Sequence, residues 1–337
     1  MRGTCSSARN TGVCLYCSTS ATLLVTIAWV FSKKQEKVAL LGTISNLTFQ
    51  MVIRWWSKET VAVVTGANQG IGYEIARQLA VHGLHVVLTS RDFDRALGAT
   101  TNLQAEGLSV QPCQLDITDA GSVMSFASWI QLEHGGIDVL VNNAGVNFNG
   151  GADNSVEFAE TVIKTNYYGT KRIIDTMLPM MRPSSFGARI VNVSSRLGRA
   201  NGRKNKIGDP TLRENLMKDE TLSEELLDEM LTNFLSQVND GTWQNGGWPQ
   251  MYTDYSLSKL ALNVYTRLKA RRLSERLDSH RVYINCFCPG WVKTQMTNWE
   301  GNMSAEEGAD TGVWMALLPV ENISSGRFYA ERREIDF

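Results

Sequence analysis

From residue 60 onward, short apolar runs rich in valine and isoleucine alternate with longer segments whose apolar positions recur at helical spacing. Such runs predict strands buried on both faces, and the helical spacing predicts helices that cover a sheet. We expect strands at 61–66, 84–90, 108–117, 137–145, 188–195, 280–290 and 326–330. We expect helices at 71–83, 93–106, 119–134, 156–181 and 253–278. This alternation predicts a single doubly wound, Rossmann-type α/β domain with a parallel sheet.

The alternation is interrupted between residues 199 and 251, where charged and polar sequence replaces a short connection before Tyr255. Thr221 and Glu224 have the spacing of a capping box, which predicts the start of a helix. One helical face then collects Leu226, Leu227, Met230, Leu231, Phe234, Leu235 and Val238. We therefore expect a helical insertion laid on the domain, either as a charged surface decoration or as a cover for a pocket.

Residues 1–57 differ from the rest of the chain, and we interpret them as an N-terminal extension of a domain at 58–337. The apolar run at 21–31 is too short to span a bilayer alone. Three interpretations remain open: an organelle transit peptide, a weak anchor involving residues 13–31, or sequence upstream of the mature protein. Met51 lies just before the folded domain. We expect no membrane association unless residues 13–31 provide it.

The charge balance argues against nucleic acid as a partner. The 33 Lys and Arg residues nearly balance 34 Asp and Glu residues, and no basic cluster is interleaved with aromatic side chains. The 6 cysteines show no disulfide framework. We interpret Cys14 and Cys17, a lone C-x-x-C, as incidental thiols and not as a zinc site, and we expect no metal. This cysteine usage fits a reducing compartment, so we expect a cytoplasmic protein.

A glycine-rich loop joins the first expected strand to the first expected helix, in the segment TGANQGIG at 65–72. Gly66 permits a tight turn, Gly70 lets the backbone approach a pyrophosphate, and Gly72 allows close packing of helix on strand. The helix N-terminus adds unpaired N–H groups and partial positive charge. In this strand–loop–helix context the motif predicts a dinucleotide site. The other loop residues that we assign to it are Asn68, Gln69 and Ile71.

The end of the second expected strand bears on which dinucleotide is bound. NAD sites usually carry a carboxylate there, whereas this chain has Ser90 followed by Arg91. A guanidinium can pair with the 2′-phosphate of NADP, which a carboxylate would repel. We therefore expect NADP(H) in preference to NAD(H). Two alternatives stay open: that Asp92 dilutes this effect, and that Arg91 is simply solvated.

Tyr255 and Lys259 are four residues apart in an expected helix, so their side chains share one face. An unperturbed tyrosine has a pKa of about 10 and is a poor acid–base catalyst at neutral pH. A lysine cation nearby favours the phenolate and lowers that pKa toward the working range. The same spacing on an ordinary helix merely decorates a surface.

Five motifs, in order, resemble those of the short-chain dehydrogenase/reductase family, over nearly everything from Thr60 to the C-terminus. They are TGANQGIG (65–72), NNAG (142–145), NVSS (192–195), YSLSK (255–259) and PGWVKT (289–294). The long insertion, GWP at 247–249 and CPGWVKT look most like the carbonyl reductase branch, with its menthol dehydrogenase and salutaridine reductase types. The chain looks like a plant member of that branch. The resemblance implies NADP(H)-dependent reduction of a carbonyl to an alcohol.

The resemblance also implies catalytic roles. Ser195 would hydrogen-bond the substrate oxygen, Tyr255 would donate the proton, and Lys259 would tune Tyr255 and hold the nicotinamide ribose. Asn166 would support a proton-relay water, with a helix-packing amide as the alternative. Ser194 is the alternative to Ser195, because neighbours on a strand point in opposite directions.

Further cofactor contacts are implied after the third, fourth and sixth strands. Asp116 would contact the adenine, unless it merely ends a strand, and Asn143 would lie beside the adenosine ribose. The implied residues are Asp116, Ile117, Asn143, Ala144, Gly145, Pro289, Gly290, Val292 and Thr294. NADP-using relatives often carry a basic residue where this chain has Gln69, which leaves more of the phosphate recognition to Arg91.

The substrate side is expected to be apolar, which suits a terpenoid, alkaloid or aromatic ketone. The candidate wall consists of Trp248, Met251, Trp291, Met296, Trp299 and Met303. The alternative is that the tryptophans pack internally. A competing function is a catalytically idle dinucleotide-binding sensor or scaffold, whose signature would be loss of a catalytic residue. Because the insertion would cover helices through which relatives dimerise, we expect a monomer.

Overall fold

The structure is a computed structural model that describes residues 54–149, 154–202, 205–276 and 280–337. They belong to one compact unit, Ile53–Phe337. The predictions for residues 1–53, including the C-x-x-C and the apolar run, lie outside the described residues. Across the described ranges, no helix combines the length and the apolar character needed to span a bilayer.

Eight strands form one sheet in the middle of this unit. They are β1 (Val61–Val64), β2 (His85–Ser90), β3 (Val110–Gln114), β4 (Val139–Asn142), β5 (Ala188–Val193), β6 (Val282–Phe287), β7 (Phe328–Ala330) and β8 (Arg333–Ile335). Their spatial order is β3-β2-β1-β4-β5-β6-β7-β8, and every neighbouring pair is parallel except β7 and β8. The predicted doubly wound fold is confirmed. Because the strand order reverses between β1 and β4, we expect a ligand crevice at their carboxyl ends.

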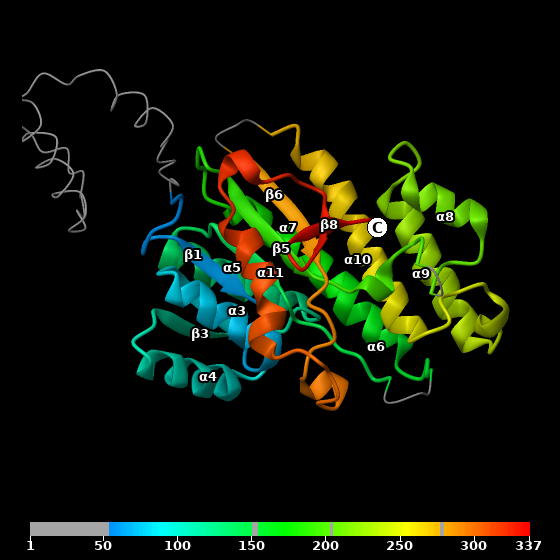
Figure 1. The fold of residues 1–337 in the computed structure, drawn as a ribbon, viewed down its shortest axis with the longest axis horizontal. Helices are drawn as coiled ribbons and strands as arrows, with labels where there is room; N and C mark the ends of the chain where they lie inside the picture. The colour runs from blue at the N-terminus through cyan, green and yellow to red at the C-terminus, as the bar shows by residue number, and fades with distance from the viewer. Residues whose placement is uncertain (1–53, 150–153, 203–204, 277–279) are drawn as a thin grey trace, which may run out of the picture. The chain divides into compact units, whose positions relative to one another are not determined.

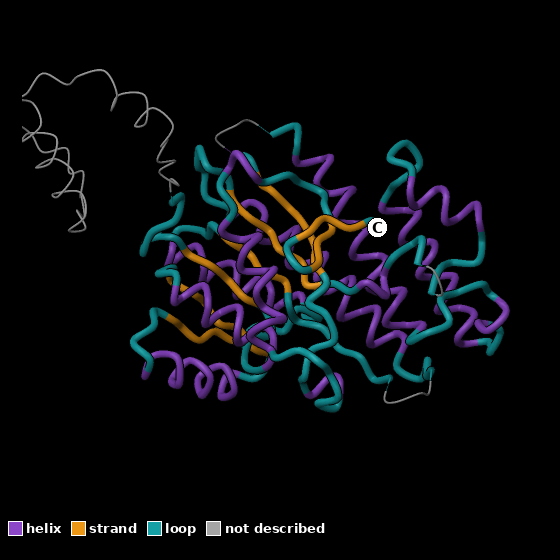
Figure 2. Tube along the Cα trace, in the orientation of Figure 1, coloured by secondary structure: helices purple, strands orange, loops and turns teal. Residues whose placement is uncertain are grey.

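Helices cover both faces of the sheet (Figures 1 and 2). They are α3 (Gly70–Val81), α4 (Phe93–Ala105), α5 (Ala120–His134), α6 (Ala159–Ile163), α7 (Thr170–Met177), α8 (Pro210–Met217), α9 (Glu224–Asn239), α10 (Thr253–Leu273) and α11 (Ala305–Leu317). Successive β1 side chains enter opposite cores. Val61 and Val63 pack with α5, α7 and α10, whereas Ala62 and Val64 pack with α3, α4 and α11. This double burial explains the uninterrupted apolar runs.

Several elements differ from the sequence-based expectation. The expected helix at 156–181 is divided into α6, a π-helical turn at Lys164–Gly169, α7 and a final 3-10 turn. Helix α11 and strand β8 were not predicted. The start of α11 carries a capping box between Ser304 and Glu307, a signal present in the sequence. Strand β8 is a three-residue edge strand without an apolar run.

The insertion contains α8 and α9, and its predicted capping box is wrong. Ser223, and not Thr221, caps α9, because the Ser223 hydroxyl accepts from the Leu226 amide at 3.1 Å. The Thr221 hydroxyl instead donates to the Asn215 carbonyl at 2.8 Å. This shift of two residues places Glu224 at the start of the helix, where its carboxylate faces neighbouring cations.

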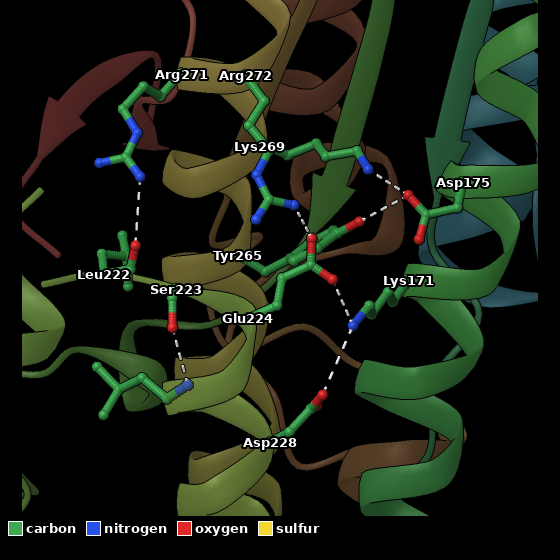
Figure 3. Close-up of polar contacts among 11 residues, drawn as sticks. Lys171, Asp175, Leu222, Ser223, Glu224, Asp228, Tyr265, Lys269, Arg271 and Arg272 are labelled. Carbon is green, nitrogen blue, oxygen red and sulfur yellow. Dashed lines mark hydrogen bonds and ion pairs between the residues drawn. The ribbon is translucent and has the colours of Figure 1, made fainter.

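The insertion is packed firmly on the domain. The predicted apolar face of α9 is confirmed, since Leu227, Leu231 and Phe234 are fully buried, and α9 contacts α6 and α10. At its start, Glu224 forms ion pairs with Lys171 of α7 at 2.6 Å and with Arg272 of α10 (Figure 3). Figure 1 shows α8 and α9 lying beside α10, away from the β3 edge of the sheet.

Candidate active site

The loop between β1 and α3 is tightly packed against the segment after β4. Gly66 and Gly70 have positive φ angles of +60° and +59°, which glycine adopts without strain. A Cβ on Gly66 would lie 2.9 Å from the Cα of Ala144, and one on Gly72 would lie 2.8 Å from the Gly66 carbonyl oxygen. Packing within the protein therefore leaves no room for a side chain at Gly66 or Gly72, so the glycines let the turn lie close to the segment after β4.

Hydrogen bonds from the Asn143 side chain hold the glycine-rich loop in place. Its Nδ2 donates to the carbonyls of Thr65 at 3.0 Å and Gly66 at 2.9 Å. The Thr65 hydroxyl accepts in return from the backbone amides of Asn143 and Ala144, both at 3.0 Å. The side chain that the family resemblance assigns to the ribose is thus used to hold the glycine loop.

Arg91, Asp92 and Asp116, which follow β2 and β3, have different surroundings. Arg91 is exposed at the end of β2. Asp92 turns away into the cap of α4, where its carboxylate accepts from the Arg95 amide at 3.2 Å. Asp116 accepts from the backbone amide and the hydroxyl of Thr118 at 2.8 and 2.7 Å, a turn that closes β3. Ile117 is buried beside it. The arrangement leaves the exposed Arg91 guanidinium available for a phosphate.

The segments that follow β1, β4 and β6 meet at the carboxyl ends of these strands. After β6, Gly290 has a φ of +88°, and Thr294 approaches the glycine loop so closely that a Cβ on Gly70 would lie 3.3 Å from its Cγ2. Gln69 donates to Gln295 across the same gap at 3.1 Å. Val292 is buried and anchors this segment. The implied residues after β1, β4 and β6 therefore lie close together, and a Cβ on Gly145 would lie 3.7 Å from Nζ of Lys259 in α10.

Ser195, and not Ser194, contacts Tyr255. The side chains of Ser195 and Tyr255 share a hydrogen bond, while Ser194 is buried and its hydroxyl donates to the Lys259 carbonyl at 3.4 Å. The Ser195 hydroxyl also accepts from the Leu197 amide at 3.1 Å. This second contact fixes the serine at the turn that follows β5.

Lys259 lies under the tyrosine ring. Its Nζ is 5.6 Å from the ring centroid of Tyr255 and donates to the Val193 carbonyl at 2.9 Å. Burial lowers the pKa of Lys259 to about 8. Burial also raises the pKa of Tyr255, against a smaller lowering by Ser195. In the protein alone, the lowering of this pKa by Lys259 that the helical spacing suggests is not among the effects on Tyr255, and Tyr255 remains a protonated phenol at neutral pH.

Asn166 joins the β4 loop to the catalytic helix. It sits fully buried in the π-helical turn, a distortion that often marks functional positions. Its Oδ1 accepts from the Val146 amide at 2.8 Å, and its Nδ2 donates to the Val146 carbonyl at 2.9 Å and the Ser258 hydroxyl at 3.0 Å. These contacts fit a packing amide, and the proton-relay role of Asn166 stays a prediction.

The candidate substrate wall is divided. Trp291 is 55% exposed, but Trp248 is 3% exposed and packs against Phe234, with its indole N–H donating to Gln237 at 2.8 Å. Trp248 thus follows the internal-packing alternative. Phe148, which sequence reasoning missed, is 45% exposed in the loop after β4. Its signal was an apolar residue three positions beyond NNAG.

Comparisons with known proteins agree with this geometry. The short chain dehydrogenase family model matches residues 60–206. Carbonyl reductase (NADPH) 1 of Pongo abelii is 40% identical over 276 residues, covering 81% of this chain and 96% of that protein. Short-chain dehydrogenase/reductase 1 of Saponaria officinalis is 39% identical over 305 residues, covering 83% and 97%. The solved structure of salutaridine reductase from Papaver somniferum has a TM-score of 0.71 and 35% identity, covering 80% of this chain and 99% of that one. This chain is therefore an oxidoreductase that belongs to the short-chain dehydrogenase/reductase family.

Proposed function

We propose that this chain is an NADP(H)-dependent reductase that converts a carbonyl on an apolar small molecule to an alcohol. The observation that carries the proposal is the meeting of Ser195, Tyr255 and Lys259 in a fold whose glycine-rich loop packs tightly at the start of α3. The names of the similar carbonyl and salutaridine reductases support the same reaction class.

The residues present fit a dinucleotide phosphate. The amides at the start of α3 would hold the pyrophosphate, and the exposed Arg91 would pair with the 2′-phosphate. Lys259 would hold the nicotinamide ribose, and the segment carrying Thr294 would border the nicotinamide. When bound, the reduced cofactor supplies the hydride. The protein's own part is to orient the carbonyl, exclude water and deliver a proton.

The proton comes from Tyr255 in this proposal. Because burial raises its pKa, the phenol is protonated at neutral pH and is ready to donate to the carbonyl oxygen as negative charge develops there. The Ser195 hydroxyl donates a second hydrogen bond to the same oxygen. Lys259 remains largely cationic at pH 7, given a pKa of about 8, and offsets the phenolate that the transfer leaves behind.

Exposed apolar side chains support an apolar ketone as substrate. They gather on the loops after β4 and β6 and at the end of the insertion. They are Phe148 (45% exposed), Met251 (51%), Trp291 (55%), Met296 (39%) and Trp299 (68%). Apolar surface of this kind around few polar groups is typical of small-molecule sites. We leave Trp248 out of this wall because it is buried.

NADPH oxidation followed by absorbance, with protein beginning near Met51 and a panel of cyclic ketones, tests this proposal. Ketone-dependent oxidation supports the reductase. Tight NADPH binding without turnover of any ketone would favour the idle sensor or scaffold instead. The presence of Asn166, Ser195, Tyr255 and Lys259 together argues for the active enzyme.

We also propose a monomer working in the cytosol. Helix α9 occupies the outer surface of α6 and α10, so a second copy could not pack directly on those helices. Light scattering that finds a stable dimer would contradict this. Free thiols at Cys113, Cys286 and Cys288 suit a reducing compartment, and fractionation of cells that express the full-length chain tests the location.

A further inference from the structure

A buried carboxylate directly precedes the catalytic tyrosine. Asp254 lies in the first turn of α10 and is 1% exposed. Its Oδ1 accepts from the Tyr255 amide at 2.6 Å and from Nδ2 of Asn149 at 2.7 Å. Both partners are uncharged, so hydrogen bonds and the positive end of the helix must offset the cost of burying the charge. Burial accordingly raises the pKa of Asp254.

Both polar atoms of the Asn149 side-chain amide form hydrogen bonds. Besides Asp254, its Nδ2 donates to Oδ1 of Asn147 at 3.0 Å, and its Oδ1 accepts from the Ser155 amide at 2.9 Å. A carboxylate can only accept hydrogen bonds, whereas an amide can turn over and offer either face. Asp254 therefore permits one orientation of Asn149, and with it one arrangement of residues 147–149.

The same loop is held at two further points, by Asn166 of the π-helical turn and by Thr253 of α10. Asn166 holds the loop at Val146 through two hydrogen bonds of 2.8 and 2.9 Å. Asn154 donates to the Thr253 hydroxyl at 2.7 Å and accepts from the Thr253 amide at 2.8 Å. Between these points Phe148 stays 45% exposed, with its ring 4.6 Å from that of Phe158.

We propose that Asp254, acting through Asn149, is a positioning residue that sets Phe148 as a wall of the substrate site beside Tyr255. The consequence is a preference for ketones whose ring is large enough to reach Phe148. This inference rests on the proposed carbonyl reduction. Asp254 itself touches neither substrate nor cofactor.

Swapping the residue types at positions 149 and 254 tests the contact between Asn149 and Asp254. Asn149→Asp alone places two carboxylates together, and adding Asp254→Asn restores one donor and one acceptor. With a bulky cyclic ketone, we expect KM to rise about tenfold in Asn149→Asp and in Asp254→Ala, with kcat within about twofold, because an interaction outside the reacting atoms is lost. We expect the double variant to recover most of that loss. A small ketone such as acetone should show little change in KM.

Glu214→Gln is the matched control, because it removes an exposed carboxylate from α8 far from Tyr255, and its kinetics should equal the wild type. An equal loss for small and bulky ketones, a loss confined to kcat, or no rescue in the double variant would overturn the inference. Hydrogen exchange of residues 146–149 gives a readout independent of turnover. Faster exchange in Asn149→Asp that is reversed in the double variant supports the contact, and unchanged exchange contradicts it. If the wild type oxidises no NADPH, the reductase proposal fails, while the exchange result still decides the positioning contact.

Discussion

The ammonium group of Lys259 donates a hydrogen bond to the backbone carbonyl of Val193 at 2.9 Å. Val193 is the last residue of β5, and Ser195 follows it by two positions, so this contact ties the catalytic helix to the turn that carries the serine. This contact, and the position of the ammonium 5.6 Å from the centroid of the Tyr255 ring, support the proposal that Lys259 holds Ser195 and Tyr255 in one place and supplies positive charge beneath the ring.

The first prediction concerns pH. Burial disfavours the Lys259 cation and lowers its pKa to about 8, so the ammonium loses its proton as the pH rises through that value. Ketone reduction should then fall, since the positive charge beneath the phenol is lost. The pH profile of kcat/KM with NADPH measures this. Deprotonation of Tyr255 does not explain a fall in kcat/KM near pH 8, because burial raises the pKa of Tyr255. A profile that stays flat to about pH 10, where an ordinary lysine titrates, would contradict the assignment.

The second prediction concerns the cofactor. Arg91→Ala should raise the KM for NADPH about tenfold or more while leaving the KM for NADH nearly unchanged, because only NADPH carries the phosphate that a guanidinium recognises. Initial rates with the two cofactors measure the change. Arg77→Ala removes an arginine of α3 that is paired with Glu106 and should affect neither cofactor. Equal losses with NADPH and NADH would rule out a phosphate contact by Arg91.

The third prediction compares two glycines in helices. Gly72→Ala places a Cβ 2.8 Å from the Gly66 carbonyl and in conflict with the Asn143 amide, so it should destabilise the fold by about 1–3 kcal/mol and weaken NADPH binding. Gly98→Ala in α4 meets nothing within 4 Å and should stabilise by about 0.5–1 kcal/mol through helix propensity. Denaturant unfolding measures both. If Gly72→Ala and Gly98→Ala changed the free energy of unfolding equally, the glycine-rich loop at 65–72 would not be tightly packed.

Much of the fold follows from the sequence because the strands are buried on both faces. Runs such as 61–64 and 282–287 lie wholly in the core, and buried parallel strands leave continuous apolar stretches. The ends of several strands, such as those expected at 61–66 and 188–195, were predicted too late, because loop residues such as Thr65 and Ser194 are buried as well. Strand β8 escaped prediction because an edge strand of three residues needs no apolar run.

The site was only partly open to sequence reasoning. Motif order predicts which segments meet, and Tyr255 and Ser195 do meet. Contacts that depend on packing could not be foreseen. Whether Trp248 faces substrate or the insertion's core depends on Phe234, and the cap of α9 lies at Ser223 although Thr221 carries the box spacing. The catalytic and cofactor roles of the individual residues stay predictions.

The fourth prediction concerns the insertion. Glu224 is paired with Lys171 and Arg272 (Figure 3). Burial alone would raise the pKa of Glu224, but the two cations have the larger combined effect, so its pKa is lowered. A carboxyl with a lowered pKa contributes stability above its unfolded pKa, and this stability is lost as the pH falls through the folded value. Glu224→Gln should lower the free energy of unfolding by about 1 kcal/mol at pH 7. It should also make that free energy depend less on pH in the acid range.

Denaturant unfolding at a series of pH values measures this effect. Glu214→Gln is again the control, because it removes an exposed carboxylate that pairs with Lys218 in the same insertion, and it should leave stability unchanged. If the two substitutions behave alike, the ion pairs of Glu224 do not hold the insertion.

The most direct test of the account is the oxidation of NADPH by a cyclic ketone, compared between the wild type and Tyr255→Phe. The substitution removes only the phenolic hydroxyl, so we expect kcat to fall about 100-fold or more, with NADPH binding retained. Ser195→Ala should also lower kcat. Turnover in Tyr255→Phe equal to that of the wild type would contradict the claim that this tyrosine delivers the proton.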